Sequence, residues 1–220
     1  MSACTLPADR LAQTGLVNLD KWLGGGLPRG HLSEIVGPRS SGRASVLCAA
    51  LAAATSRGEG VVLIDTFDSF DPISGSVAGV DLTRLLWIRG QQVTPPNAWR
   101  VIRRAIKAAG LVLQAGRFGV VALDLAEAPP ELIRRLPFPI WLRLARVIEG
   151  SATVGLVVGS QSLGRSSAGR SIILGSSGQS ARWSGDSQRG RLLRGLELHV
   201  QVESARRLSQ VFRLCAEEIV

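Results

Sequence analysis

The stretch Gly37–Ser45 keeps the glycine spacing of a phosphate-binding loop, a motif that requires a strand, a tight turn and a helix in that order. In the working pattern G-x-x-x-x-G-K-[ST], backbone amides surround the phosphates, the Lys reaches the terminal phosphates and the hydroxyl holds Mg²⁺. Here the Lys position is Arg43 and the hydroxyl position is Ala44. We therefore expect an α/β unit whose loop binds ATP weakly or not at all, and a function in binding rather than catalysis.

The chain is strongly basic. Its formal net charge is +9 and its isoelectric point is about 11.2, and 24 of its 26 basic residues are Arg. Guanidinium groups pair with oxyanions in a bidentate manner, so the composition favours phosphate, nucleic acid or acidic protein surfaces as partners. A genome rich in G and C would also raise the ratio of Arg to Lys, but it would not explain the net charge.

The cysteines and apolar runs indicate a cytoplasmic chain. Cys4, Cys48 and Cys215 are odd in number and far apart, so neither a metal site nor a disulfide framework is expected. The N-terminus has no signal-peptide pattern, and the longest apolar run, Val46–Ala54, is too short to cross a bilayer. We expect no contact with a membrane.

Short apolar strands alternate with helical segments over most of the chain. Strands are predicted at 31–36, 61–64, 85–88, 120–123 and 154–158, and helices at 16–23, 45–56, 97–115 and 141–149. This order predicts a mostly parallel central sheet with helices on both faces. Alternating residues at 196–202 and a last strand at 211–215 predict an antiparallel C-terminal extension. We expect one domain over 14–220, preceded by a tail at 1–13.

Ser, Gly and Arg dominate the segment 162–190, in which only 171–175 is predicted as a brief strand. Arg165, Arg170 and Arg182 could contact phosphates, with Trp183 available to stack on a base. The alternative is a solvated loop with Trp183 packed against the protein body. Further upstream, Phe138 and Trp141 flank a proline kink, and either side chain could face a partner or pack in the core.

The order of several segments resembles the ATPase core of the RecA recombinases. These segments are 14–20, 25–30, 34–38, 63–65, 71–72, 79–82, the strand that ends at Asp124, and 157–161. The resemblance implies a RecA-like P-loop fold. It also implies that a vestigial nucleotide site comprises Gly37, Ser41, Gly42, Arg43, Ala44 and Ser45, together with Asp124 and Gln161.

The departures from that family fall on its chemical positions. Phe67 stands where the family has a Glu that orients the attacking water, and Ser74 stands where a Tyr stacks on adenine. Asp124 resembles the acid on the metal side, and Gln161 resembles the Gln that senses the nucleotide. Asp124, like Asp65, could instead cap a turn or pair with an Arg. We expect no catalytic residues, no bound metal and no cofactor.

A basic RecA-like chain without a working loop resembles the ImuA-type proteins. With 220 residues, it is expected to lack the C-terminal domain of the recombinases. The resemblance implies an accessory role in damage-induced (SOS) mutagenesis and translesion synthesis, with RecA and an ImuB-type polymerase-like protein as partners and single-stranded DNA as a further candidate. The alternatives are a SulA-like inhibitor of cell division and a weak ATPase.

Overall fold

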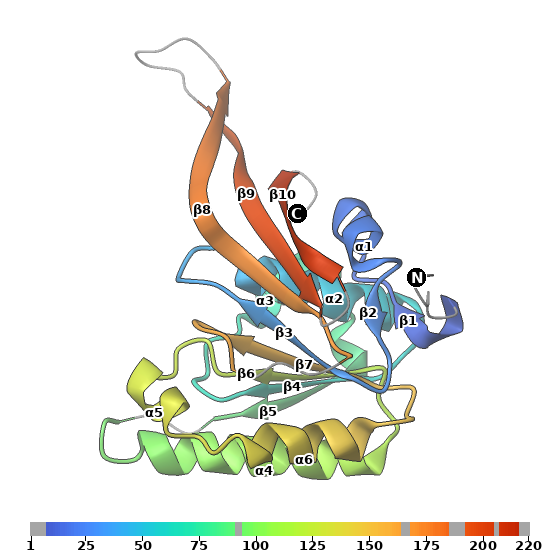
Figure 1. The fold of residues 1–220 in the computed structure, drawn as a ribbon, viewed down its shortest axis with the longest axis vertical. Helices are drawn as coiled ribbons and strands as arrows, with labels where there is room; N and C mark the ends of the chain where they lie inside the picture. The colour runs from blue at the N-terminus through green and yellow to red at the C-terminus, as the bar shows by residue number, and fades with distance from the viewer. Residues whose placement is uncertain (1–7, 91–93, 164–167, 185–191, 205–206, 216–220) are drawn as a thin grey trace.

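The computed structural model describes residues 8–90, 94–163, 168–184, 192–204 and 207–215. Within them, one large sheet has eight strands in the order β10-β9-β8-β3-β7-β6-β4-β5, and a small second sheet pairs β1 with β2. Figure 1 shows the large sheet running from the central strands into a long, projecting antiparallel ribbon. The strands are β1 (Leu11–Ala12), β2 (Leu27–Pro28), β3 (Leu32–Val36), β4 (Val61–Asp65), β5 (Leu85–Arg89), β6 (Val120–Asp124), β7 (Val154–Gly159), β8 (Ser171–Ser184), β9 (Leu192–Ser204) and β10 (Arg207–Cys215).

The helices cover both faces of the parallel part of this sheet. They are α1 (Val17–Leu23), α2 (Arg43–Ser56), α3 (Pro72–Val77), α4 (Ala98–Ala115), α5 (Pro130–Arg134) and α6 (Pro139–Ile148), with 3-10 turns η1 (Ala8–Arg10) and η2 (Leu82–Arg84). None of the described helices combines the length and the apolar character that crossing a bilayer needs.

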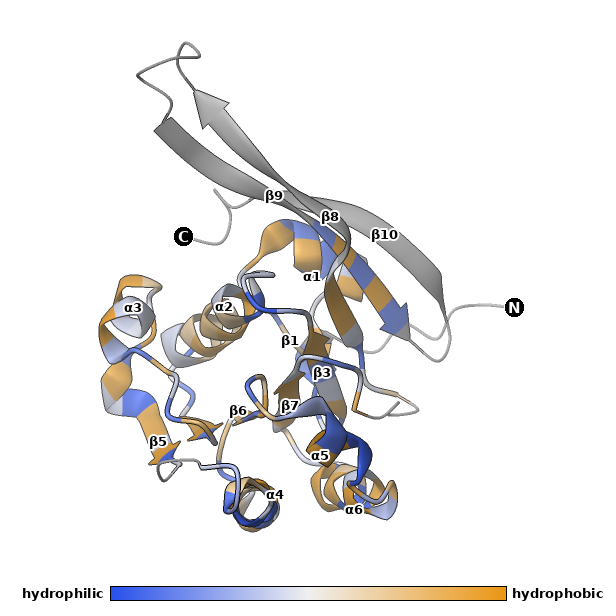
Figure 2. Cartoon of the chain, turned by 90° about the vertical axis from the view of Figure 1, so that its left-hand side faces the viewer, coloured by the Kyte–Doolittle hydropathy of each residue, from blue (hydrophilic) through white to orange (hydrophobic). Residues whose placement is uncertain are grey.

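Two hydrophobic clusters lie on opposite faces of the sheet because strand side chains alternate. In β6, Val120 and Ala122 join the cluster that contains α1 and α2, whereas Val121 and Leu123 join the cluster that contains α4 and α6. Figure 2 shows apolar residues along the central strands and strongly hydrophilic residues on α4. Apart from the terminal Asp65 and Asp124, β4, β6 and β7 are apolar because both of their faces are covered, which confirms the predicted α/β class.

The ends of the sheet differ from the prediction in extent. The strand expected at 171–175 continues to Ser184, so β8 is a 14-residue strand rather than a brief one. It pairs in parallel with β3 and antiparallel with β9, and β9 pairs antiparallel with β10. The antiparallel extension is therefore confirmed, and much of the segment that was expected to be a loop belongs to it.

Part of the expected N-terminal tail is built into the fold. Leu11 and Ala12 pair with Pro28 and Leu27, and Ala12 is buried. This approach requires Gly26, since a Cβ there would lie 2.4 Å from the carbonyl oxygen of Ala12. Helices α3 and α5 were not predicted; they have only six and five residues, too few for a periodic pattern.

Candidate functional site

The phosphate-loop sequence connects β3 to α2 at the carboxyl end of the sheet. The amide of Gly37 donates to the carbonyl of Gly159 at the end of β7, 3.1 Å away. Ser40 and Gly42 adopt left-handed backbone angles, with φ of 60° and 87°. A Cβ at Gly37 would lie 2.3 Å from Oγ of Ser41, so this position requires glycine. The loop therefore makes a tight turn into the N-terminus of α2, and helix N-termini in general attract anions.

The side chain of Arg43 fills this turn from within. Arg43 is buried, with 7% of its surface exposed. Its Nη1 donates to the carbonyl of Gly37 at 2.7 Å, and its Nη2 donates to Oε1 of Glu127 at 2.5 Å. The guanidinium in the Lys position is thus bonded to the loop's own first glycine and to a carboxylate from the segment after β6.

Glu127 joins two arginines of the loop. Nε of Arg39 donates to Oε2 of Glu127 at 2.8 Å, while Arg43 holds the other carboxylate oxygen. Arg39 is well exposed on the outside of this contact. Next along the helix, Ala44 is exposed and Ser45 is half-buried. Ala44 thus places a methyl group where the working motif has the hydroxyl that holds Mg²⁺.

One polar atom of the loop lacks a partner. Ser41 is completely buried, and its Oγ has no hydrogen-bond partner in the part of the chain that the structure describes. The unpaired hydroxyl lies against Gly37, which leaves no room for a ligand on that side. It does not replace the missing hydroxyl of the magnesium position, since it precedes that position by three residues.

Asp65 and Asp124 end adjacent strands and occupy paired positions in the sheet. Asp65 is fully buried and accepts hydrogen bonds from the amides of Ser69 and Phe70, both at 2.9 Å, and from Nε1 of Trp87 at 3.2 Å. It therefore organises the loop that follows β4, as the capping interpretation expects.

Within the described part of the chain, the carboxylate of Asp124 has fewer hydrogen-bond donors around it than that of Asp65. Its Oδ1 accepts a bond from the amide of Ala126 at 2.8 Å. The pKa of Asp124 is raised to about 6, chiefly by burial and to a smaller extent by the carboxylates of Asp65 and Glu127, while the Ala126 amide and Arg43 act in the opposite direction. The carboxyl that the resemblance places on the metal side thus caps a turn, and at neutral pH its charge is only partly compensated.

Phe67 and Ser74, which differ from the recombinase pattern, both have contacts within the fold. Phe67 is half-buried and packs against the hydrophobic cluster that contains α4 and α6. The amide and hydroxyl of Ser74 both donate to Oδ2 of Asp71, at 2.9 and 2.5 Å, and so begin α3. Gln161 donates from Nε2 to the carbonyl of Pro130 at 3.1 Å, which ties the end of β7 to α5.

The candidate nucleic-acid residues do not form one cluster. Arg165 lies outside the described residues. Arg170 donates to the carbonyls of Leu23, Ala168 and Gly169 at 3.4–3.5 Å, so it packs against the chain's own backbone. Arg182 and Trp183 lie twelve and thirteen positions further on in β8, opposite Gly195 and Leu193 of β9. Arg170 thus directly precedes β8, whereas Arg182 lies near the far end of this strand.

Sequence reasoning missed Glu127 and Arg39. Glu127 lies 84 residues from Arg43, and no local motif predicts that a carboxylate from the loop after β6 meets the loop after β3. The predicted parallel sheet gave a general indication, because the loops that follow neighbouring parallel strands lie at the same end of the sheet.

Comparison with known proteins agrees with this architecture. The family model of the RecA N-terminal domain matches residues 8–115. Protein RecA of Saccharopolyspora erythraea is 34% identical over 116 residues, which cover 52% of this chain and 31% of that protein. The DNA repair protein recA homolog 1, chloroplastic, of Arabidopsis thaliana is 31% identical over 115 residues, 52% of this chain and 24% of that protein.

A third relative shows the same limited coverage. Protein RecA of Synechocystis sp. is 41% identical over 73 residues, which are 33% of this chain and 21% of that protein. The matched region thus spans less than a third of the length of these three curated relatives. The match and the mostly parallel sheet agree on one conclusion: the chain has a RecA-like fold and is similar to RecA over residues 8–115.

Proposed function

We propose that this RecA-like chain is a non-catalytic accessory protein of damage-induced mutagenesis, of the ImuA type, which binds RecA and an ImuB-type polymerase-like protein. The observation that supports the proposal is the internal pairing of Arg43 with Gly37 and Glu127. A phosphate loop whose cationic side chain is already engaged retains the architecture of a recombinase core without its ATP cycle.

The loop's side chains do not fit magnesium-bound ATP. To reach a terminal phosphate, Arg43 would have to give up two charge-assisted or buried hydrogen bonds, each worth about 1–3 kcal/mol. Ala44 has no oxygen for Mg²⁺, and Phe67 has no carboxylate for a water molecule. Isothermal titration with Mg-ATP should therefore show no low-micromolar binding, and phosphate release should not exceed that of an Asp124→Ala variant.

Removing Glu127 tests the internal pairing directly. Glu127→Ala leaves Arg39 and Arg43 without their carboxylate, so we expect the melting temperature to fall and inorganic pyrophosphate to restore part of it. In the wild-type protein, where the pairing is intact, pyrophosphate should raise the melting temperature by less than a third of the rise in Glu127→Ala. Glu131→Ala removes an exposed carboxylate on α5 and is the matched control. Equal pyrophosphate shifts in wild type and Glu127→Ala would contradict the proposed pairing.

We propose that RecA binds at the edge of the sheet formed by β5 and the neighbouring helix α3. β5 is the terminal strand on its side of the described sheet, and α3, which contacts the η2 turn before β5, exposes Ile73 and Val77 by 74% and 77%. An edge of this kind suits the joining or capping of a RecA filament. Purified RecA and the ImuB-type protein should each be retained by the chain in a pull-down.

The double substitution Ile73→Asp/Val77→Asp should reduce RecA retention at least tenfold. Val17→Asp, which changes an apolar residue on α1 that is 66% exposed, is the control and should leave retention unchanged. If neither RecA nor the ImuB-type protein is retained by wild type, the proposed function is wrong.

A further inference from the structure

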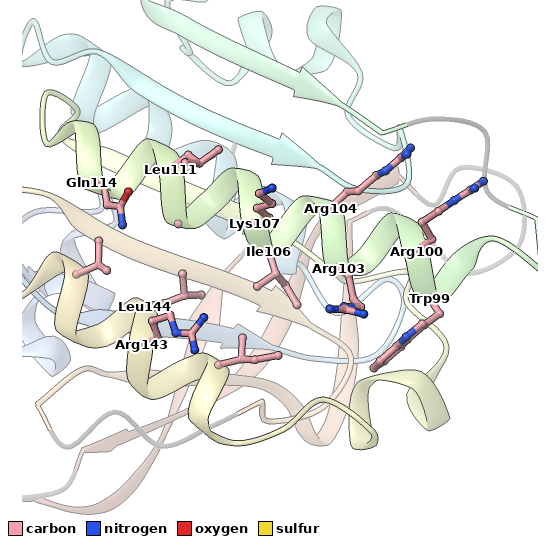
Figure 3. Close-up of a pocket in the computed structure, with 13 residues that line it drawn as sticks. Trp99, Arg100, Arg103, Arg104, Ile106, Lys107, Leu111, Gln114, Arg143 and Leu144 are labelled. Atoms are coloured by element: carbon pink, nitrogen blue, oxygen red, sulfur yellow. The ribbon is translucent and has the colours of Figure 1, made fainter.

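A groove between α4 and α6 lies on the face of the sheet opposite α2. It has a volume of about 630 Å³ and is shown in Figure 3. Its floor is apolar, with Trp99, Ile140, Leu144 and Val147, and its α4 side includes Leu111, which is 59% exposed. Phe138, at the start of α6, is 54% exposed. Of the two aromatic residues at the proline kink, Trp141 is thus in the core and Phe138 is outside.

Basic residues line the groove beside this apolar floor. Five of the residues that line the groove are Arg100, Arg103, Arg104, Lys107 and Arg143, and no lining residue is acidic. Across the described residues, no salt bridge is recorded for Arg100, Arg103, Lys107 or Arg143. Figure 3 shows Arg103 and Arg143 on facing helices. Several like charges around a low-dielectric strip create a positive potential that favours an anionic partner.

We propose that this groove docks an acidic amphipathic helix of a partner protein. Apolar residues spaced i, i+3/i+4 and i+7 on that helix would enter the floor, and its Asp and Glu side chains would pair with the surrounding basic residues. The lining positions on α4 run from Trp99 to Gln114, which at 1.5 Å per residue is about 22 Å, or four turns of a docked helix. The proposal uses none of the phosphate-loop residues and is independent of the proposed function.

A nucleic acid fits this groove less well. Phosphates would be held against Leu111, Leu144 and Val147, which offer them no donor. Trp99, the aromatic residue in the lining, is already covered by the guanidinium of Arg135 at 5.5 Å from its ring centre. Binding of single strands relies on a backbone-tracking basic groove with several stacking platforms, whereas an acidic amphipathic helix satisfies both the charge and the apolar strip.

Gly110 provides a steric test that leaves the fold intact. It lies within α4 and lines the groove, and a Cβ there would meet Cδ2 of Leu144 at 3.6 Å, an ordinary contact. Glycine inside a helix costs about 1 kcal/mol relative to alanine. Gly110→Ala should therefore raise the melting temperature and leave docking within threefold of wild type. Gly110→Leu should fold equally well and reduce docking at least tenfold, because its side chain fills the floor.

The probe is a fluorescein-labelled 16-residue helical peptide with Leu at i, i+3, i+4 and i+7 and Glu on both flanks. Fluorescence anisotropy with the full chain should show micromolar binding that weakens with added salt. A peptide with Lys in place of Glu, and one with Ser in place of Leu, should each bind at least tenfold more weakly. The double substitution Lys107→Glu/Arg143→Glu should weaken binding of the Glu–Leu peptide at least tenfold. The pair Arg117→Glu/Arg146→Glu makes the same charge change outside the lining and should weaken it less than threefold.

Several outcomes would overturn the proposal. One is the absence of binding by the Glu–Leu peptide at 100 μM; another is equal binding by the Lys–Leu peptide. A third is retention of peptide binding by Gly110→Leu. If a dT20 oligonucleotide or vesicles of phosphatidylglycerol bind, and Lys107→Glu/Arg143→Glu abolishes that binding while the peptide fails, the groove serves nucleic acid or a lipid surface instead.

Discussion

At the scale of single residues, the loop after β3 is defined by the internal pairing of its charges. Arg43 faces inward to Gly37 and Glu127 rather than outward to a ligand. Asp124, close by, is left with a carboxylate whose ionisation is opposed by burial and by Asp65 and Glu127. Among the described residues, Arg43 and the backbone amide of Ala126 favour the ionised form.

Asp124 is therefore expected to make the fold less stable at neutral pH than at acid pH. Its pKa is raised from 3.8 to about 6, so the folded protein binds this proton more tightly than the unfolded chain. The contribution to stability falls as the pH rises through that window and is lowest above it. Asp124→Asn keeps an oxygen for the Ala126 amide and should add about 1–3 kcal/mol to the unfolding free energy at pH 7.5, and little at pH 3.5.

Urea unfolding of wild type and Asp124→Asn across this pH range measures the difference. Glu131→Gln, an exposed carboxyl on α5, is the control and should show no such pH-dependent gain. A constant difference between wild type and Asp124→Asn from pH 3.5 to 7.5 would show that burial does not perturb this carboxyl.

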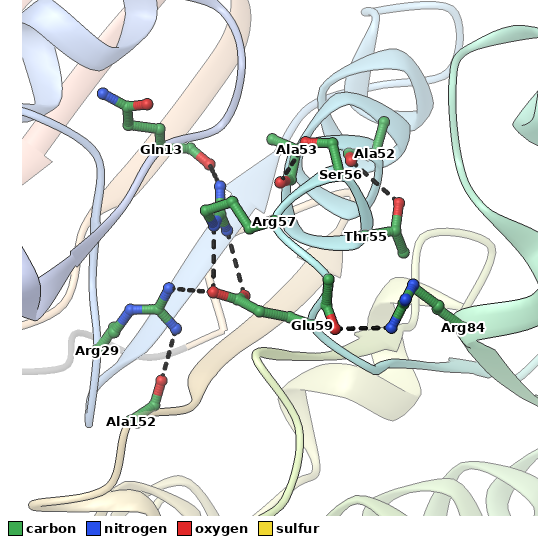
Figure 4. A network of polar contacts seen from close by, with 11 residues as sticks. Gln13, Arg29, Ala52, Ala53, Thr55, Ser56, Arg57, Glu59, Arg84 and Ala152 are labelled. Atoms are coloured by element: carbon green, nitrogen blue, oxygen red, sulfur yellow. Dashed lines mark hydrogen bonds and ion pairs between the residues drawn. The ribbon is translucent and has the colours of Figure 1, made fainter.

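At the scale of elements, the carboxylate of Glu59 connects three segments near the C-terminal end of α2. Figure 4 shows Glu59, in the α2–β4 connection, between Arg29 and Arg57. Glu59 Oε1 lies 2.5 Å from Nη2 of Arg29 and 3.1 Å from Nε of Arg57. Arg29 also donates to the carbonyl of Ala152, and Arg57 donates to that of Gln13. The network joins the turn after β2, the end of α2 and the segment before β7.

Glu59→Gln should weaken this junction. Burial opposes the ionisation of Glu59, but the hydrogen bonds and charges of Arg57 and Arg29 prevail and lower its pKa from 4.5. The stabilisation is therefore present above about pH 4.5 and is lost as the pH falls through the lowered value. We expect a loss of about 1–2 kcal/mol at pH 7 and a smaller loss at acid pH, measured by urea unfolding. An unchanged midpoint at pH 7 would contradict this role.

At the scale of the whole molecule, the parallel core and the antiparallel extension meet at Glu34. This buried residue of β3 accepts bonds from Oγ of Ser162 at 2.8 Å, the amide of Leu163 at 3.0 Å and Oγ of Ser171 at 2.6 Å. Two of these donors follow β7 and the third begins β8. One carboxylate therefore positions the strand through which the sheet changes from parallel to antiparallel.

Glu34→Ala removes the shared acceptor from three donors in partly buried hydrogen bonds. We expect the unfolding free energy to fall by about 2–3 kcal/mol, together with faster hydrogen exchange at the Leu163 amide than at amides of β6. Ser162→Ala, which deletes a single donor, should cost less than half as much. Unchanged exchange at Leu163 in Glu34→Ala would show that the junction does not depend on this contact.

Local patterns in the sequence determined most of the parallel core. The apolar runs of four residues in β4 and β6, the six-residue run of β7, and the helical spacing of Ala98, Ile102 and Ala105 in α4 depend on neighbours within one element. The same holds for the turn around Gly37, since its glycine spacing is local. These features were predictable because burial of each element requires its own periodicity.

Only the tertiary structure decided the length of β8 and the state of the loop. Residues 175–184 lack an apolar alternation, and their strand results from pairing with β9 rather than from their own side chains. The pairing of Arg43 with Glu127 joins residues 84 positions apart. A substitution within a motif is visible in the sequence, but the partner of the new side chain depends on which loops the sheet brings to one edge.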